Sequence, residues 1–466
     1  MGSINNRYRL HYHIMAPTGW LNDPNGLIQF KGQYHVFYQH YPYSADWGPM
    51  HWGHAVSEDL VHWKHLPVAL APDQAYEEGC FSGSAVDNHG VLTLIYTAHD
   101  ENRNPKEQQC IAESTDGVHF VKYAGNPVIR QPPLEGSADF RDPKVWFEDG
   151  LWHMVLGTTK DGRAKAVLYQ SDDLRAWQYV GVLFESDGTL GDMWECPDFF
   201  ALGDKHVLVA SPMNMEGGKN IYIIGEYDKT HHRFTPEKIQ EVDRGHDFYA
   251  AQTFADIHGR RVLIAWMDRW GSPFPTQPDG WAGALTIPRE LRLEEDGIRA
   301  TPVKEMEKLR ETKWIDASFR LDTSMRQILP GVEGDALELN IRIRFDDPAC
   351  TRFGVQLRGA KDGGEKTLVC YDPVQELLTV DTQRAGKESN GIASGKLCKQ
   401  EGRLDLHIFI DKCSVEVFAG QGRLVLTERI YPDEDSQYYD MFTENGGCFV
   451  EQVQAWRLQN IWETEL

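Results

Sequence analysis

Residues 146–156 read Trp-Phe-Glu-Asp-Gly-Leu-Trp-His-Met-Val-Leu, and this stretch decides the fold class. An apolar segment runs into Glu148-Asp149-Gly150, and a second apolar segment follows at once. An acidic residue followed by glycine, between two runs of strand formers, is typical of a tight β-hairpin turn. The stretch therefore predicts two antiparallel strands joined by a short turn.

The same hairpin pattern occurs five times along the chain. The turn glycines stand at 32, 90, 150, 203 and 259, so the intervals are 58, 60, 53 and 56 residues. A Ser- and Asp-containing segment that ends in an aromatic residue repeats in phase, at 57–63, 114–120 and 171–177. Units of about four strands that repeat at this period are typical of propeller blades. We therefore expect an all-β, five-bladed β-propeller over residues 1–302.

The pattern changes after Pro302. The following segment is charged, with Met306 and Leu309 on one face, and it predicts a linker helix over residues 303–315. Alternating strands then return without the earlier period, for example at 337–343, 404–410 and 414–419. This pattern predicts a C-terminal β-sandwich over residues 316–466. Two domains also suit a chain of 466 residues, which exceeds the usual size of one hydrophobic core.

Composition narrows the classes of function. The net charge is −23, from 47 Lys and Arg against 70 Asp and Glu, so neither nucleic acid nor a membrane is an expected partner. The eight cysteines contain no Cys-x-x-Cys pair, so we expect no metal site, no cofactor and no disulfide framework. Scattered thiols favour a cytoplasmic protein. The start Met1-Gly2-Ser3 would equally suit a secreted protein whose signal peptide had been replaced.

Three carboxylates stand at similar distances before the turn glycines. Asp23 lies nine residues before Gly32, and Asp142 and Glu195 each lie eight residues before theirs. Equivalent positions on the first strands of successive blades converge at one end of a propeller. Taken singly, Asp23 would read as part of a solvent-exposed turn and Asp142 as half of an ion pair with Arg141. Their shared phase instead predicts one cluster of three inward-facing carboxylates.

Such a cluster suits glycoside hydrolysis. That reaction needs one carboxylate as nucleophile and a second as acid and then base, and a third can hold sugar hydroxyls. Glu195 lies between Trp194 and Cys196, an apolar setting that suits a proton donor. The expected partner is therefore a small sugar.

The motifs around these residues resemble those of glycoside hydrolase family 32, the family of invertases, sucrose-6-phosphate hydrolases, inulinases and levanases. They occur in the family's order, at Trp20–Gly26, Phe81–Ala85, Phe140–Trp146, Trp194–Asp198 and Gly280–Gly283. The resemblance implies a five-bladed propeller joined to a β-sandwich, and a β-fructofuranosidase that retains anomeric configuration.

The resemblance also implies roles for individual residues. Asp23 would be the nucleophile, Glu195 the acid and base, and Asp142 the group that holds fructose hydroxyls. The two reacting carboxyls are then expected about 5 to 5.5 Å apart. The positions that match sugar-binding residues of the family are Trp20, Leu21, Asn22, Gln39, Trp47, Phe81, Ser82, Arg141 and Trp281.

Two alternatives stay open at this stage. A fructosyltransferase would use the same covalent intermediate but pass fructose to a second sugar, and a non-catalytic carbohydrate-binding propeller would bind without cleaving. The preference among sucrose, sucrose-6-phosphate and fructans, and the oligomeric state, are equally open. A phosphate pocket would need basic groups near the site, and the candidates are His99, Arg103, Lys106, Lys219 and Arg269.

Overall fold

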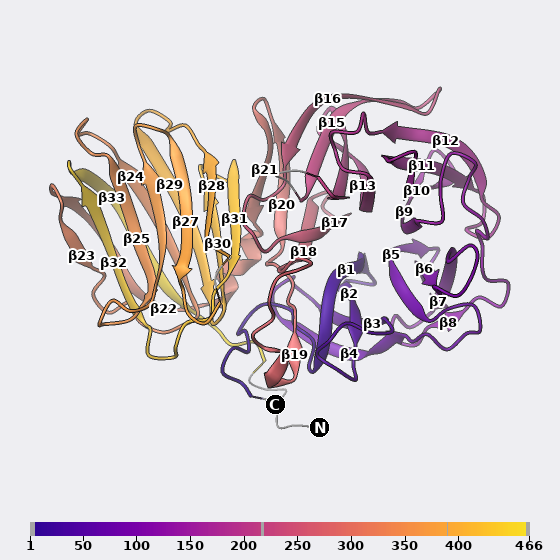
Figure 1. Ribbon diagram of the computed structural model, residues 1–466, viewed down its shortest axis with the longest axis horizontal. Coiled ribbons are helices and arrows are strands. Elements are labelled where there is room, and N and C mark those ends of the chain that lie inside the picture. Colours follow the sequence, from indigo (N-terminus) through magenta and orange to yellow (C-terminus); the bar gives the residue numbers. More distant parts are fainter. Residues whose placement is uncertain (1–4, 216–218, 389, 463–466) are drawn as a thin grey trace.

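The computed structural model describes residues 5–215, 219–388 and 390–462, and within these residues the chain is almost entirely β. Figure 1 shows two regions side by side: five small sheets, and a pair of larger ones. The described helices are two short 3-10 segments, η1 (Gln277–Asp279) and η2 (Lys304–Leu309). No helix among the described residues is long and apolar enough to cross a membrane.

We call residues 19–302 the ring region, because its five antiparallel sheets lie around a common centre (Figure 1). The first three sheets consist of β1 (Gly19–Phe30), β2 (Gln33–Tyr41), β3 (His51–Ser57) and β4 (Trp63–Leu70); of β5 (Gly79–Asn88), β6 (Val91–His99), β7 (Glu107–Ser114) and β8 (Val121–Lys122); and of β9 (Phe140–Glu148), β10 (Leu151–Lys160), β11 (Arg163–Ser171) and β12 (Gln178–Glu185). The last two consist of β13 (Met193–Leu202), β14 (Lys205–Met213), β15 (Ile221–Asp228) and β16 (Arg233–Glu241); and of β17 (Tyr249–Ala255), β18 (Arg261–Trp266), β20 (Arg289–Glu294) and β21 (Gly297–Pro302).

The first strand of each sheet faces the centre of the ring. Strands β1, β5, β9, β13 and β17 each contact the next in this order, and β17 contacts β1. The two-residue strand β19 (Trp281–Ala282) pairs in parallel with the start of β1, so the end of the ring region is hydrogen-bonded to its beginning. The sequence that predicted five repeats thus forms five sheets in a closed order.

Burial explains why inner and outer strands differ in composition. The second strand β10 is buried over almost its whole length, because neighbouring sheets cover both of its faces. The outermost strand β16 carries Arg233, Glu237 and Lys238 and is mostly exposed. Charged side chains on such an edge discourage pairing with other chains.

The turn glycines have the backbone conformation that the hairpins require. Asp149 and Gly150 have φ of 51° and 84°, and His89 and Gly90 have φ of 53° and 89°. A two-residue turn that matches the twist of its strands needs positive φ at both positions, and glycine adopts it without steric cost.

The remaining residues form two six-stranded sheets, which we call the two-sheet region. One contains β22 (Arg310–Leu321), β33 (Cys448–Leu458), β24 (Leu337–Arg344), β29 (Arg403–Asp411), β30 (Ser414–Ala419) and β31 (Leu424–Arg429). The other contains β23 (Arg326–Ile328), β32 (Tyr438–Glu444), β25 (Arg352–Gly359), β26 (Lys366–Asp372), β27 (Leu377–Arg384) and β28 (Ile392–Lys396). Leu339 of one sheet and Val355 of the other belong to the same hydrophobic core.

The segment between the regions corrects the expectation of a helix over residues 303–315. Only Lys304–Leu309 is helical, with Met306 and Leu309 buried, and strand β22 begins at Arg310. The helix ends there because the chain from Arg310 onward pairs with β33.

A group of fully buried charges joins the two regions, and we call it the boundary cluster. Arg289 of β20 contacts Asp243 at 2.8 Å and Glu416 of β30 at 2.6 Å. His13 contacts Asp411 at 2.8 Å and the other oxygen of Glu416 at 3.0 Å. Every carboxylate of this cluster therefore has a cationic or imidazole partner.

Candidate active site

All five inner strands have an irregularity in their pairing, and in β9, β13 and β17 it is a bulge with a left-handed residue. In β13 the pairing is interrupted between Glu195 and Asp198, and in β17 between Tyr249 and Gln252. In β9 it is interrupted between Arg141 and Lys144, which pair with Gly157 and Val155 of β10. A left-handed residue marks each bulge: Asp142 with φ 64°, Cys196 with φ 48° and Ala250 with φ 54°. Bulges are common beside active sites, where they redirect side chains.

The bulges bring Arg141, Glu195 and Tyr249 together, each one residue before the left-handed position of its strand. Arg141 donates to Glu195 Oε1 from Nη2 at 3.0 Å and from Nε at 3.2 Å. The Tyr249 hydroxyl donates to Glu195 Oε2 at 2.6 Å. Both oxygens of Glu195 are therefore held, while its side chain keeps 19 % exposure. Glu195 is fixed in position yet accessible from outside.

Asp23 lies on β1, partly exposed, and three side chains orient it. Ser82 of β5 donates to its Oδ2 at 2.6 Å, and Asn22 donates to its Oδ1 at 2.9 Å. The Cys196 thiol lies 3.5 Å from Oδ2. Burial raises the pKa of Asp23, the hydrogen bond from Ser82 opposes this, and the nearby charge of Glu195 adds to it.

Asp142 is the most deeply buried of the three carboxylates. Its Oδ2 accepts a hydrogen bond from the backbone N–H of Cys196 at 2.8 Å, and its own N–H donates to Thr97 Oγ1 at 3.0 Å. Burial raises the pKa of Asp142 to about 8; Arg141 opposes this shift, and the charges of Glu195 and Asp23 add to it. Glu195 is thus close enough to raise the pKa of both Asp23 and Asp142. We call these three residues with Arg141 the mouth cluster, and the end of the ring where they lie the mouth.

Counting from the glycines put Glu195 in phase with Asp142, and strand pairing corrects this by one residue. In the β9–β10 turn, Gly150 is the second of the two turn residues, because Glu148 pairs with Leu151. In the β13–β14 turn, Gly203 is the first, because Leu202 pairs with Lys205. Glu195 is therefore the counterpart of Arg141, and Cys196 that of Asp142. The three carboxylates still converge, because neighbouring positions at a bulge both face the mouth cluster.

The residues expected to bind sugar fall into two groups. Asn22, Ser82 and Arg141 contact the carboxylates directly. Trp47 is 50 % exposed, and its ring centroid lies 6.3 Å from that of Phe81, the residue before Ser82. These five residues are placed at or beside the mouth cluster.

The other four predicted residues are buried. Leu21 is fully buried and Trp281 is 1 % exposed, and both belong to the same hydrophobic core. Trp20 is 3 % exposed and donates from Nε1 to Asn22 Oδ1 at 2.7 Å. Gln39 is 2 % exposed and donates to the Cys80 carbonyl at 2.9 Å. Trp20 and Gln39 support the site from behind, and Leu21 and Trp281 are core residues.

Four residues around the carboxylates were not among those predicted: Tyr249, Cys196, Thr97 and Glu107. Arg141 contacts Glu107 at 3.2 Å and Asp139 at 3.3 Å. Tyr249 had a usable signal, since it lies in the first strand of the fifth repeat at the level of Glu195. Glu107 had none, because it begins the third strand of its sheet, outside the aligned positions.

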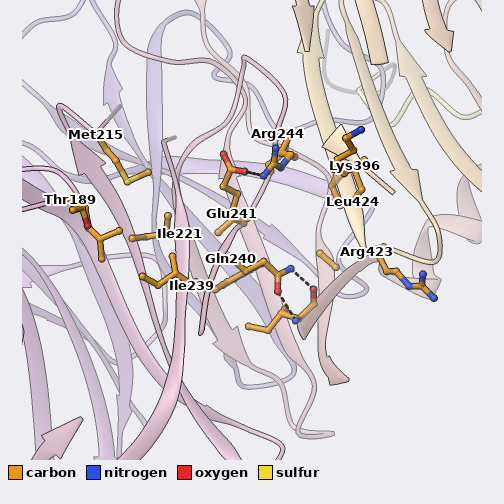
Figure 2. A pocket seen from close by; sticks show the side chains of 18 residues that line it. Thr189, Met215, Ile221, Ile239, Gln240, Glu241, Arg244, Lys396, Arg423 and Leu424 are labelled. Carbon is orange, nitrogen blue, oxygen red and sulfur yellow. Dashed lines mark hydrogen bonds and ion pairs between the residues drawn. The ribbon is translucent and has the colours of Figure 1, made fainter. Parts of the chain in front are cut away.

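A cavity of about 540 Å³ lies away from these residues, where the ring region meets the two-sheet region (Figure 2). It is lined by Ile239 and Gln240 of β16 on one side and by Arg423 and Leu424 on the other. None of the mouth residues lines it. Among residues 5–215, 219–388 and 390–462, no group of three or more His, Cys, Asp or Glu side chains is placed to hold a metal ion.

Comparison with known proteins agrees with the motifs. The family model described as the glycosyl hydrolases family 32 N-terminal domain matches residues 13–302, and the family 32 C-terminal model matches residues 305–457. The sucrose-6-phosphate hydrolase of Zymomonas mobilis subsp. mobilis is 42 % identical, over 96 % of this chain and 92 % of that protein. The raffinose invertase of Escherichia coli is 40 % identical, over 96 % and 94 %. A variant of the Bombyx mori β-fructofuranosidase solved with sucrose superposes with a TM-score of 0.85, at 36 % identity, over 98 % of this chain and 95 % of that one.

Proposed function

This chain belongs to glycosyl hydrolase family 32, and we propose that it is a retaining β-fructofuranosidase that cleaves sucrose or a related fructoside through a covalent fructosyl-enzyme intermediate. The observation that carries the proposal is the mouth cluster, in which one accessible carboxylate is fixed by two donors beside a second that lies partly exposed. Two carboxylates of this kind are what retaining glycosidases use.

The proposed architecture is a five-bladed β-propeller over residues 1–302, a short linker that ends at Leu309, and a β-sandwich that begins with β22 at Arg310. The cyclic contacts among the five inner strands support the propeller. The shared core of the two six-stranded sheets supports the sandwich.

Asp23 is the proposed nucleophile. Its oxygen attacks the anomeric C2 of the fructosyl unit, while the bond from C2 to the leaving oxygen breaks. Ser82 and Asn22 donate one hydrogen bond to each oxygen of Asp23, which fixes the carboxylate for attack. Its partial burial raises the energy of the free carboxylate and so favours the ester that forms.

Glu195 is the proposed acid and base. It gives its proton to the leaving oxygen, and it then takes a proton from the water that attacks C2 and releases Asp23. Two displacements at C2 give net retention. Arg141 and Tyr249 hold Glu195 in place for both transfers, Arg141 through Oε1 and Tyr249 through Oε2.

Asp142 is the proposed binding group for fructose hydroxyls. One of its oxygens accepts the Cys196 N–H, which leaves the other for the substrate. Burial raises the pKa of Asp142 to about 8 because it removes water from the carboxyl group. A fructose hydroxyl that donates a hydrogen bond to this group would replace the lost water. The reaction needs no cofactor, and we place the protein in the cytoplasm on its scattered thiols.

Purified protein assayed on sucrose tests the proposal. Asp23→Asn and Glu195→Gln are each expected to lower kcat by on the order of 10³-fold or more, because each removes a reacting group. Asp228→Asn, an exposed carboxylate in a turn of the fourth sheet, is the matched control and should keep full activity. NMR of the first product should show β-fructofuranose before mutarotation. Undiminished activity in either site variant, or release of the α anomer, would contradict the assignment.

A further inference from the structure

The rim of the mouth beside Arg141 is crowded with carboxylates. Arg141 contacts Glu107, Asp139 and Glu195. Lys106 contacts Asp139 at 3.0 Å and Glu101 at 3.6 Å. These contacts join two cations, Arg141 and Lys106, to four carboxylates. The network is thus net negative before Asp23 and Asp142 are counted.

Most of the basic residues near this rim are already engaged. His99 lies 3.3 Å from Glu101 and 3.4 Å from Glu107, and its ring stacks on Phe81 at 4.0 Å. Arg103 contacts Asp100 at 3.1 Å and donates to the Ala75 carbonyl. Carboxylates thus already lie beside both His99 and Arg103 and offset the positive charge that either could offer a phosphate.

The other two candidates lie on the opposite side, near the start of β17. Lys219 is turned inward, and its Nζ donates to the carbonyl oxygens of Gly245 and His246. Arg269 donates to Ser272 Oγ at 3.1 Å, and within the described residues no carboxylate contacts it. Among the described residues, Arg269 is thus the candidate that contacts neither a carboxylate nor a backbone carbonyl.

The leaving sugar must sit beside the crowded rim. Glu195 has to reach the glycosidic oxygen to protonate it, so the leaving sugar lies within a few ångströms of Glu195 and its partner Arg141. Asp139, 40 % exposed, is the next carboxylate outward from Arg141. A phosphate on that sugar would bring two negative charges toward this rim, in a protein whose net charge is already −23.

We propose that the mouth selects uncharged fructosides and discriminates against those that carry a phosphate on the leaving sugar. This inference rests on the proposed function and goes beyond it by naming the charge of the substrate. It applies to this chain's own rim, where the carboxylates around Lys106 and Arg141 occupy the cations that a phosphate would need.

Three substrates separate charge from bulk. Raffinose carries a neutral galactosyl group on O6 of the glucosyl unit of sucrose, the same oxygen that carries phosphate in sucrose-6-phosphate. We expect kcat/KM on sucrose-6-phosphate to be at least about tenfold below that on sucrose, with raffinose between them. Raising the salt concentration should bring kcat/KM on sucrose-6-phosphate closer to that on sucrose, because salt screens exposed charges. The ratio between raffinose and sucrose should not change.

Glu101→Gln sharpens the test, because Glu101 is exposed and touches Lys106 and His99 but none of the reacting groups. It should raise kcat/KM on sucrose-6-phosphate by about two- to fivefold and leave sucrose within twofold. Glu311→Gln makes the same charge change on β22 of the two-sheet region and should change neither value.

Equal or faster turnover of sucrose-6-phosphate would overturn the inference. If that turnover were lost in Arg269→Ala, the phosphate would belong to the loop after β18 instead. Hydrolysis of none of the three substrates is a different result, since it would overturn the proposed function and this inference with it.

Discussion

The mouth cluster and the boundary cluster both combine carboxylates with an arginine, but their carboxylate pKa values move in opposite directions. The pKa is raised for Asp23 and Asp142 of the mouth, and lowered for Asp411 and Glu416 of the boundary. In the boundary cluster, burial alone would raise the pKa of Asp411 and Glu416, but His13 lowers the pKa of Asp411, and Arg289 with His13 lowers that of Glu416. In the mouth cluster, burial raises the pKa of Asp23 and Asp142, and the available donors do not compensate. Full pairing stabilises the contact between regions, whereas incomplete pairing leaves carboxylates able to react.

The strongest way to break this comparison is to unpair the boundary cluster. Arg289→Ala leaves Asp243 and Glu416 buried without their cation, and we expect a loss of about 3–5 kcal/mol in the free energy of unfolding. Denaturant titration measures it. Arg292→Ala, which removes an exposed pair with Glu290, should cost less than about 1 kcal/mol. Equal losses in the two variants would show that the boundary charges contribute little.

Neutralising Asp142 should raise the free energy of unfolding at high pH, in contrast to the loss expected for Arg289→Ala. Because its pKa is about 8 when folded and near 4 when unfolded, the folded state holds the proton between these values, so the stability contributed by this group is lost as pH rises from 4 to 8. Asp142→Asn removes that loss and keeps a residue that tolerates the left-handed φ of 64°.

The variant should therefore match the parent in thermal stability near pH 5 and exceed it at pH 8, by roughly 1–3 kcal/mol. Melting curves at both pH values measure this, alongside a fall in activity. A variant that is less stable than the parent at pH 8 would mean that Asp142 is as well paired as the boundary carboxylates.

A smaller change sharpens the account of Glu195. Tyr249→Phe removes the hydroxyl donor to Oε2 and leaves the Arg141 contacts intact. We expect kcat/KM on sucrose to fall about tenfold, equivalent to about 1.4 kcal/mol, with little change in melting temperature. Tyr227→Phe, at an outer strand of the fourth sheet, is the matched control. An unchanged rate would show that Arg141 alone positions Glu195.

Local chemistry made the ring region predictable from sequence. Gly32, Gly90 and Gly150 mark turns that need positive φ, so the spacing of these residues reported the spacing of the sheets. The three carboxylates were found for the same reason, since Asp23, Asp142 and Glu195 lie eight or nine residues before a turn glycine.

What the sequence missed depended on pairing between distant strands. Both turns have two residues, yet Gly203 is the first residue of its turn and Gly150 the second of its own, which shifted the alignment of Glu195 by one residue. The pairing of Arg310 onward with β33 ended the linker helix early. Burial of Leu21 and Trp281 followed from tertiary packing, because a motif identifies positions but not the direction in which a side chain points.

In the proposed mechanism Asp23 forms a covalent bond to C2 of fructose. The decisive experiment is to trap this fructosyl-enzyme. In Glu195→Gln, a β-fructofuranoside with a good leaving group can still transfer its fructosyl unit to Asp23 without an acid, but the second step lacks its base, so the fructosyl-enzyme should accumulate. Mass spectrometry of the peptide digest should then show one anhydrofructosyl unit on the peptide that contains Asp23. An adduct on another residue, or rapid turnover with inversion and no adduct, would contradict the account.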